Sequence, residues 1–194
     1  MKKRVAFLAS GGGSNLQALL DAMQAPDFPA EPVLVFSDKS GARALERARL
    51  AGVRAEHLDP KAYSTREGFD MALVALLEPF QPDLICLAGY MRILTPAFFN
   101  AFMGRIINIH PALLPAFGGP GMYGHHVHEA VLKAGARESG ATVHWVVPEV
   151  DAGPIILQAR VPVLPGDTPE TLAARVLEQE HKLYPEAVKG LCLS

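Results

Sequence analysis

Two polar side chains that could carry out acid–base chemistry lie two residues apart near the middle of the chain. Asn108 and His110 belong to an isoleucine-rich stretch that is typical of a buried strand, and Pro111 should end that strand. Because residues i and i+2 of a strand point to the same face, both side chains should project toward one spot. An amide can donate to a developing oxyanion and an imidazole can move a proton, so the pair suits carbonyl chemistry. The alternative is a strand end with two polar groups that serve structure alone.

The glycine-rich stretch at residues 10–15 (SGGGSN) is a second candidate site. It lies between an apolar run and leucines at helical spacing, which predicts a strand, a turn and a helix. Free N–H groups at such a helix N-terminus favour phosphate binding, although a tight turn with Ser14 as N-cap would also explain the sequence. No Gly-Lys-Ser/Thr follows, which excludes a Walker A loop, and Leu16 replaces the third glycine of a dinucleotide fingerprint. Asp38, near the end of the next predicted strand, is the one feature that favours that fingerprint.

Three carboxylates each have two interpretations. Asp151 and Glu149 lie in a predicted turn at residues 148–154. A carboxylate beside His110 would favour the imidazolium and raise the pKa of the histidine, but both could also be ordinary turn residues. Glu180 falls on the apolar stripe of the last predicted helix. Because a carboxylate on a buried face needs a partner, Glu180 either pairs with an arginine or faces a ligand.

The composition excludes several classes of function. With 194 residues, of which 49% are hydrophobic, one domain with a substantial core is expected. A net charge of -2 argues against a nucleic-acid-binding surface, and no apolar run is long enough for a membrane span or a signal peptide. Two cysteines make no disulfide framework, so a cytoplasmic location is expected. His125, His126 and His128 lack an accompanying cysteine or carboxylate pattern, which predicts a helix start and no metal site.

The elements that must position these residues alternate along the chain. Strands are predicted at residues 5–9, 32–36, 53–58 (with charges typical of an edge), 83–88, 106–110, 142–147 and 155–161. Helices are predicted at 16–23, 42–51, 66–77, 97–102 and 127–134, with a last helix capped by Asp167 or Thr168. The pattern predicts a single-domain α/β fold, a mostly parallel, Rossmann-like sheet with helices on both faces and an antiparallel C-terminal strand pair. Ligands bind beyond the carboxyl ends of parallel strands, where the first, fourth and fifth predicted strands end in polar sequence.

Taken together, five motifs resemble those of the folate-dependent phosphoribosylglycinamide formyltransferases of purine synthesis, from residue 5 to about residue 185. They are SGGGSN at 10–15, LAGYMRIL at 87–94, NIHPALLP at 108–115, DAGPI at 151–155 and QEH at 179–181. Their order and spacing make the resemblance specific. It implies an enzyme that transfers the formyl group of 10-formyltetrahydrofolate, its cosubstrate, to the amine of glycinamide ribonucleotide. It also implies small-molecule substrates, no metal, and a monomer or homodimer.

The resemblance further implies roles for individual residues. Asn108, His110 and Asp151 would be catalytic. Gly13, Ser14 and Asn15 would hold the phosphate of the ribonucleotide, and Glu180 would contact the same substrate. The folate site would be lined by Arg66, Met91, Arg92, Ile93, Leu94, Asn108, Val147, Pro148, Glu149, Val150 and Asp151. Within one domain of residues 1–194, about 1–104 would form the phosphate-binding half and 105–194 the catalytic and folate-binding half.

Two departures and three alternatives accompany this interpretation. Leu177 stands where some members have a glutamine that contacts the nucleotide, and the loop at 117–124 is longer than in some members.

Formyltetrahydrofolate deformylase and methionyl-tRNA formyltransferase share the Asn–His–Asp set, but they usually carry a further domain for which this chain leaves no room. A noncatalytic nucleotide-binding module would explain the glycine-rich loop and Asp38 but would give Asn108 and His110 no role.

Overall fold

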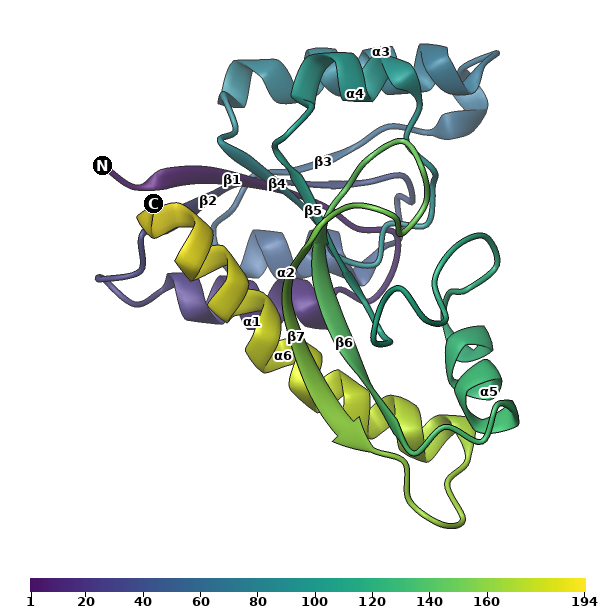
Figure 1. Ribbon diagram of the computed structural model, residues 1–194. Helices are drawn as coiled ribbons and strands as arrows, with labels where there is room; N and C mark the ends of the chain where they lie inside the picture. Colours follow the sequence, from purple (N-terminus) through teal and green to yellow (C-terminus); the bar gives the residue numbers. More distant parts are fainter.

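A seven-stranded mixed sheet forms the centre of the fold, and the computed structural model describes all 194 residues (Figure 1). The strands are β1 (Lys3–Leu8), β2 (Ala30–Ser37), β3 (Ala55–His57), β4 (Leu84–Leu87), β5 (Ile106–His110), β6 (Glu138–Trp145) and β7 (Ile155–Pro162). Their order across the sheet is β3-β2-β1-β4-β5-β6-β7. The first five strands are parallel, whereas β6 is antiparallel to β5 and β7 is antiparallel to β6. The predicted fold class is confirmed.

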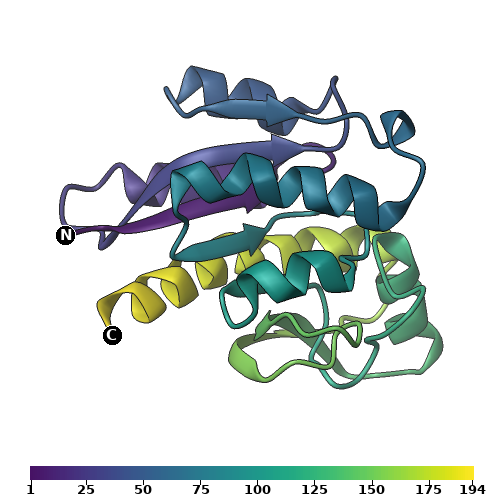
Figure 2. The same cartoon turned by 90° about the horizontal axis from the view of Figure 1, so that it is seen from above.

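Helices cover both faces of the sheet. They are α1 (Ser14–Met23), α2 (Arg43–Leu50), α3 (Arg66–Leu77), α4 (Pro96–Phe102), α5 (His125–Lys133) and α6 (Pro169–Leu193), with short 3-10 turns at Pro60–Ala62 and Glu78–Phe80. Helices α3 and α4 lie over one face, and α1, α2 and α6 lie over the other (Figures 1 and 2). No helix combines the length and the apolar character needed to cross a membrane.

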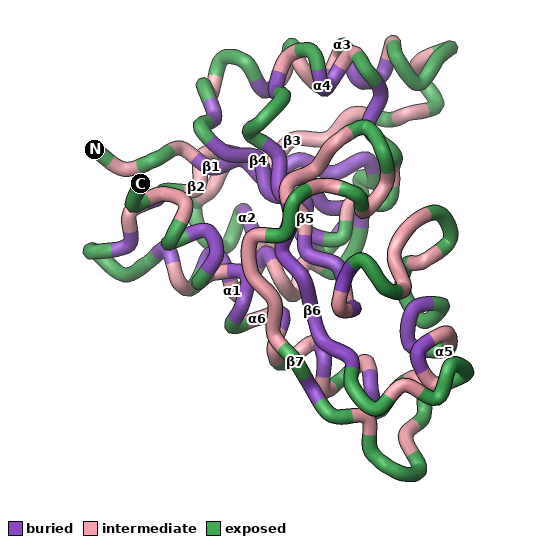
Figure 3. The backbone as a smooth tube through the Cα atoms, viewed as in Figure 1, coloured by how far each residue is buried: buried purple, intermediate pink, exposed green.

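Alternate residues of the central strands contribute to two separate apolar layers. On β1, Val5 and Phe7 pack in the layer with α1, α2 and α6, whereas Ala6 and Leu8 pack beneath α3 and α4. Burial on both faces explains why the central strands read as continuous apolar runs, and Figure 3 shows their buried backbone at the middle of the molecule. Cys86 of β4 is fully buried, as its apolar surroundings in the sequence predicted.

Most strands differ in length from the prediction, and β6 and β3 show the physical reasons. Strand β6 starts at Glu138 rather than at residue 142, because a polar residue and a glycine hide the start of the strand. A Cβ on Gly140 would clash with the carbonyl oxygen of Ala159 on β7, so glycine is required there for the two strands to pair. Strand β3 is shorter than predicted and lies at the edge of the sheet, as its charges indicated.

Helix α6 is fixed at its start and at its middle. Thr168 caps the helix by accepting a hydrogen bond from the N–H of Thr171, whose hydroxyl in turn accepts from the N–H of Thr168. The buried Tyr184 hydroxyl donates to the carbonyl oxygen of Leu87 at 2.8 Å, with the carbonyl oxygen of Ile107 at 3.3 Å. One phenol therefore attaches α6 to β4 and β5, next to the candidate catalytic residues.

Replacing Tyr184 by phenylalanine should lower the free energy of unfolding by about 1–2 kcal/mol, because a buried carbonyl loses its donor while the ring is kept. Chemical denaturation of the purified protein measures this change. Tyr123→Phe is the matched control, since Tyr123 is 52% exposed and its hydroxyl makes no hydrogen bond, and it should leave stability unchanged. Equal stability of the Tyr184→Phe protein and the wild type would contradict the assignment.

Candidate active site

The candidate catalytic pair lies where β5 extends past its parallel neighbour. Leu87, the last residue of β4, pairs with Asn108, so His110 lies beyond the end of β4. Ile107 and Ile109 point into the apolar layer that contains α1 and α6. Asn108 and His110 therefore share the opposite face of β5, as predicted, at the carboxyl end of the parallel strands.

Asp151 reaches this pair from the turn between β6 and β7. Its Oδ2 lies 3.6 Å from Nδ1 of His110, and its Oδ1 lies 3.8 Å from Nε2 of His144. Oδ2 also accepts a hydrogen bond of 2.9 Å from the backbone N–H of Gly119. The structure therefore brings this carboxylate to His110, and the loop that follows β5 helps to hold it there.

The imidazole of His110 lies between two oxygen acceptors. Its Nε2 donates to the carbonyl oxygen of Phe117 at 2.8 Å, while Nδ1 faces Asp151. Phe117 and Asp151 both have a φ of 56°, a left-handed conformation that residues other than glycine rarely adopt. Strained backbone of this kind is concentrated at functional sites. Both ring nitrogens therefore face groups to which an N–H can donate.

His144 is a fourth polar member of this cluster, and the sequence analysis missed it. It lies directly opposite Asn108 in the antiparallel ladder between β5 and β6. Its Nδ1 donates to the carbonyl oxygen of Trp145 at 3.1 Å, which leaves Nε2 to accept from the Asn108 amide at 3.4 Å. Burial lowers the pKa of His144, opposed in part by the Trp145 carbonyl and the charge of Asp151, so the neutral ring is favoured. Pairing the fifth predicted strand with the sixth would have revealed this residue.

The glycine-rich loop presents free donors at the start of α1. The N-cap is Gly13, with a φ of 74°, and no side chain caps the helix, so the alternative that made Ser14 the N-cap is wrong. A Cβ at position 13 would come within 3.0 Å of Ala44 on α2, which explains the glycine. The N–H groups of Ser14, Asn15 and Leu16 donate to no acceptor in the protein. They remain available to an anion.

Glu180 lies beside these donors, on the apolar face of α6. It is 8% exposed, and its Oε1 accepts a hydrogen bond of 3.0 Å from Nδ2 of Asn15. The interpretation that paired Glu180 with an arginine is therefore wrong. Burial raises the pKa of the Glu180 carboxyl, and the hydrogen bond from Asn15 opposes part of that rise. Because Oδ1 of Asn15 is buried without a partner, the pair keeps hydrogen-bonding capacity for a ligand.

Arg47 of α2 is a second residue that the sequence analysis did not identify. Its Nε donates to the carbonyl oxygen of Gly12 at 2.7 Å, and its Nη1 donates to the side chain of Gln17 at 3.2 Å. Arg47 thus braces the glycine-rich loop and places a cation near the start of α1, where it favours an anion. Nothing in the sequence pattern of α2 indicates this contact.

The residues expected to line a folate site come partly from the loop after β4, a neighbour of β5. Met91 and Ile93 are exposed apolar side chains, whereas Leu94 is buried. Arg66 donates to the carbonyl oxygen of Ile93 at 3.2 Å. The Arg92 guanidinium lies 4.7 Å from the centroid of an aromatic ring of α3. This loop therefore combines apolar surface with two held cations.

The second expected part of that site is the turn at residues 147–151, which follows β6, the other neighbour of β5. The N–H of Trp145 donates to the carbonyl oxygen of Pro154 at 2.9 Å and closes the base of the turn. A Cβ on Gly153 would clash with the carbonyl oxygen of Trp145, so glycine is required for this closure. The two loops thus flank Asn108 from opposite sides of β5.

The three neighbouring histidines lie at the start of a helix, as predicted. His125 and His126 begin α5, and His128 is buried on its inner face. No group of three or more His, Cys, Asp or Glu side chains in the chain is arranged to hold a metal ion.

Replacing Glu180 by glutamine should stabilise the fold near neutral pH. Because the pKa of Glu180 is raised by folding, the folded chain binds this proton more tightly than the unfolded chain. The stability that protonation supplies is complete in acid and is lost as the pH rises above the unfolded-state value of about 4.3. The glutamine variant should therefore melt at a higher temperature than the wild type at neutral pH.

Thermal unfolding followed by circular dichroism at neutral pH and in acid below that value measures the difference. The two proteins should melt together in acid, and the exposed Glu178→Gln should match the wild type at both pH values. A wild type that is the more stable protein at neutral pH would contradict the prediction.

Comparison with known proteins places this site in a family. A sequence profile described as formyl transferase matches residues 3–188. The trifunctional purine biosynthetic protein adenosine-3 of Gallus gallus is 48% identical over 188 residues, which are 97% of this chain and 18% of that protein. The phosphoribosylglycinamide formyltransferase of Escherichia coli K12 is 45% identical over 181 residues, which are 93% of this chain and 83% of that protein.

Solved structures agree with the sequence relatives. The crystal structure of phosphoribosylglycinamide formyltransferase from Brucella melitensis superposes with a TM-score of 0.93 at 49% identity, covering 100% of this chain and 97% of that chain. The chain thus spans less than a fifth of the trifunctional relatives but almost all of the single-function bacterial ones. The resemblance found in the sequence is confirmed, and the chain belongs to the formyl transferase family.

Proposed function

We propose that the protein is a phosphoribosylglycinamide formyltransferase. It transfers the formyl group of 10-formyltetrahydrofolate to the amine of glycinamide ribonucleotide in de novo purine (IMP) synthesis, giving formylglycinamide ribonucleotide and tetrahydrofolate. The observation that carries this proposal is the convergence of Asn108, His110 and Asp151 at the carboxyl end of β5. The names of the E. coli and Brucella relatives support it. The enzyme is cytoplasmic, acts on small molecules without a metal, and is a monomer or homodimer.

The polar cluster on β5 supports acyl transfer to an amine. Asn108 and protonated His110 stabilise the oxyanion that develops when the neutral amine attacks the formyl carbon, the first through its amide and the second through its positive charge. Asp151 stabilises the charged imidazole. It also orders a water that passes the proton from the attacking amine to N10 of the folate as the bond between the formyl carbon and N10 breaks. His144 contributes by holding the Asn108 amide in position.

The start of α1 suits the phosphate of the ribonucleotide. Gly13, Ser14 and Asn15 supply unpaired donors there, and Glu180, beside Asn15, contacts the same substrate. Leu177, one turn before Glu180 on α6, supplies no polar contact of its own. The phosphate-binding half, about residues 1–104, and the catalytic and folate-binding half, about 105–194, therefore both contribute to the ribonucleotide site.

The folate cosubstrate lies across the two loops beside β5. Its lining comprises Arg66, Met91, Arg92, Ile93 and Leu94 from one side and Val147, Pro148, Glu149, Val150 and Asp151 from the other, with Asn108 between them. The exposed apolar side chains after β4 favour a flat aromatic ligand, and the arginines there favour its carboxylates.

An absorbance assay tests the activity directly. Loss of the formyl group from a 10-formyl folate is followed with and without glycinamide ribonucleotide. Turnover that requires the ribonucleotide supports the proposal. Loss of the formyl group to water alone would identify a deformylase, and no reaction in either case would overturn the assignment as a formyl transferase.

The variants His110→Ala and Asn108→Ala should each lower kcat by about 100- to 1,000-fold, because each removes a group that stabilises the oxyanion. Steady-state kinetics at saturating concentrations of both substrates measures the loss. The exposed His126→Ala is the matched control and should keep wild-type turnover. Near-normal kcat in a folded His110→Ala or Asn108→Ala protein would remove these residues from the catalytic machinery.

A further inference from the structure

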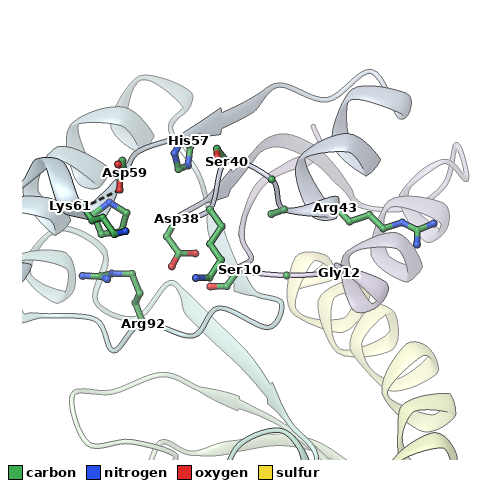
Figure 4. Close-up of a pocket in the computed structure, with 14 residues that line it drawn as sticks. Ser10, Gly12, Asp38, Ser40, Arg43, His57, Asp59, Lys61 and Arg92 are labelled. Carbon is green, nitrogen blue, oxygen red and sulfur yellow. Dashed lines mark hydrogen bonds between the residues drawn. The ribbon is translucent and has the colours of Figure 1, made fainter.

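A large pocket lies beside the candidate active site and not within it. It has a volume of about 870 Å³ and opens at the carboxyl ends of β1, β2 and β3 (Figure 4). Arg92 is the one residue of the proposed folate and ribonucleotide sites that lines it, and no member of the catalytic cluster does. Its lining is polar, with Ala42 and Pro60 as the only apolar side chains. The proposed formyl transfer leaves this pocket without a role.

Asp38, directly after β2, is the outstanding polar group of this pocket. The side chain is 8% exposed, and its Oδ1 is buried without a hydrogen-bond partner. It forms no ion pair with any cation of the chain. Figure 4 shows the carboxylate projecting into the middle of the pocket, between Ser10 and Arg92. A buried carboxylate oxygen without a donor is costly, so a ligand that supplies a donor would be favoured here.

A second unpaired group lies close to Asp38. The Tyr90 hydroxyl is buried and makes no hydrogen bond. Burial raises the pKa of Tyr90, and the nearby charge of Asp38 adds to that rise. Tyr90 is not one of the residues that line the pocket, so Asp38 is the unpaired group that a ligand can reach there. A hydroxyl group of a ligand can satisfy it.

The charges around the pocket favour an anion elsewhere on the same ligand. Lys39, Arg43, Lys61 and Arg92 outnumber the two carboxylates of the lining. In Figure 4 the Arg43 side chain points away from the centre of the pocket, so Arg43 is poorly placed to meet a ligand there. A wholly anionic ligand would be repelled by Asp38, and a cationic one by the four basic residues. The pocket therefore fits a molecule with hydroxyl groups at one end and a phosphate at the other.

The position of Asp38 in the fold points to a ribose. In doubly wound α/β proteins, an acidic residue at the end of the second strand of the nucleotide-binding unit accepts hydrogen bonds from ribose hydroxyls. Asp38 occupies that place relative to β1, the glycine-rich loop and β2. The N–H groups of Gly11 and Gly12, which also line the pocket, donate to no acceptor in the protein. No Phe, Tyr or Trp ring lines the pocket, and His57 is its one aromatic side chain, so it offers the sugar phosphate more contacts than a base.

We propose that this pocket is a second ligand site, which binds a ribosyl phosphate through its vicinal hydroxyls and its phosphate. The hydroxyls donate to Asp38, and the phosphate lies toward Lys39 and Lys61. The site is separate from the ribonucleotide site at Asn15 and Glu180. The ligand is either a free pentose phosphate or the sugar phosphate part of a nucleotide.

Isothermal titration calorimetry tests the site with AMP and with ribose 5-phosphate as probes. The protein is first saturated with glycinamide ribonucleotide, so that neither probe can occupy the start of α1. Binding should persist, and 2',3'-dideoxy-AMP should bind about 10- to 100-fold more weakly than AMP, because hydrogen bonds to a charged group are lost. AMP that binds much more tightly than ribose 5-phosphate identifies a nucleotide, whereas equal affinities identify a pentose phosphate.

Asp38→Asn keeps the shape of the side chain. It should weaken the binding of AMP by a similar factor and have little effect on the binding of 2',3'-dideoxy-AMP. Asp59→Asn is the matched control, because Asp59 lines the same pocket but already accepts a hydrogen bond from the N–H of Lys61. It should leave AMP binding unchanged. The probe with the missing hydroxyls needs no variant, so the test does not depend on the folding of Asp38→Asn.

Three results would overturn the proposal. They are no binding of either probe at millimolar concentration, equal affinity for AMP and its dideoxy form, and displacement of AMP by the ribonucleotide or by a monoglutamyl folate. Displacement would assign the pocket to a substrate site. Formyl transfer itself is measured separately, so failure here leaves the proposed activity in place.

Discussion

The antiparallel register between β5 and β6 is the constraint on which the candidate active site depends. It sets His144 opposite Asn108 and Thr142 opposite His110. Through His144 this register orients the side-chain amide of Asn108. Thr142 fixes the start of the following loop, because its hydroxyl donates to the Ala112 carbonyl oxygen and accepts from the N–H of Leu114. A slip of one residue would turn both side chains to the other face of the sheet and would undo both arrangements together.

Three buried carboxylates show how the fold separates structure from ligand binding. Asp70 of α3 accepts two hydrogen bonds from Thr95, at 2.7 and 2.8 Å, and this satisfied group joins α3 to the start of α4. Glu180 has one donor, and Asp38 has none. The protein thus supplies two donors to Asp70, one to Glu180 and none to Asp38, and a ligand can supply what the protein does not. Tyr184 holds α6 against the sheet one turn after Glu180, so the helix tolerates that charge.

Much of the fold could be predicted because the apolar periodicity and the helix signals agree. The helix at residues 66–77 was predicted with its observed bounds, and Thr168 was one of two predicted caps. The sequence could also place Asn108 and His110 on one face, since period two along a strand is local information. Contacts between distant segments could not be predicted from the sequence. Arg47 bracing Gly12, and the start of β6 at Glu138, depend on neighbours that no local pattern specifies.

The hydrogen bond between Asn15 and Glu180 joins residues that are 165 positions apart in the chain. During synthesis, the glycine-rich loop and α1 leave the ribosome well before α6 does. Contacts of such wide separation form late, because the entropy of closing the chain must be overcome first. A nascent chain can therefore complete most of its parallel sheet while the polar pocket at the start of α1 remains open on one side. The protein acquires this pocket only after α6 has been synthesised, which couples the appearance of the site to the emergence of that helix.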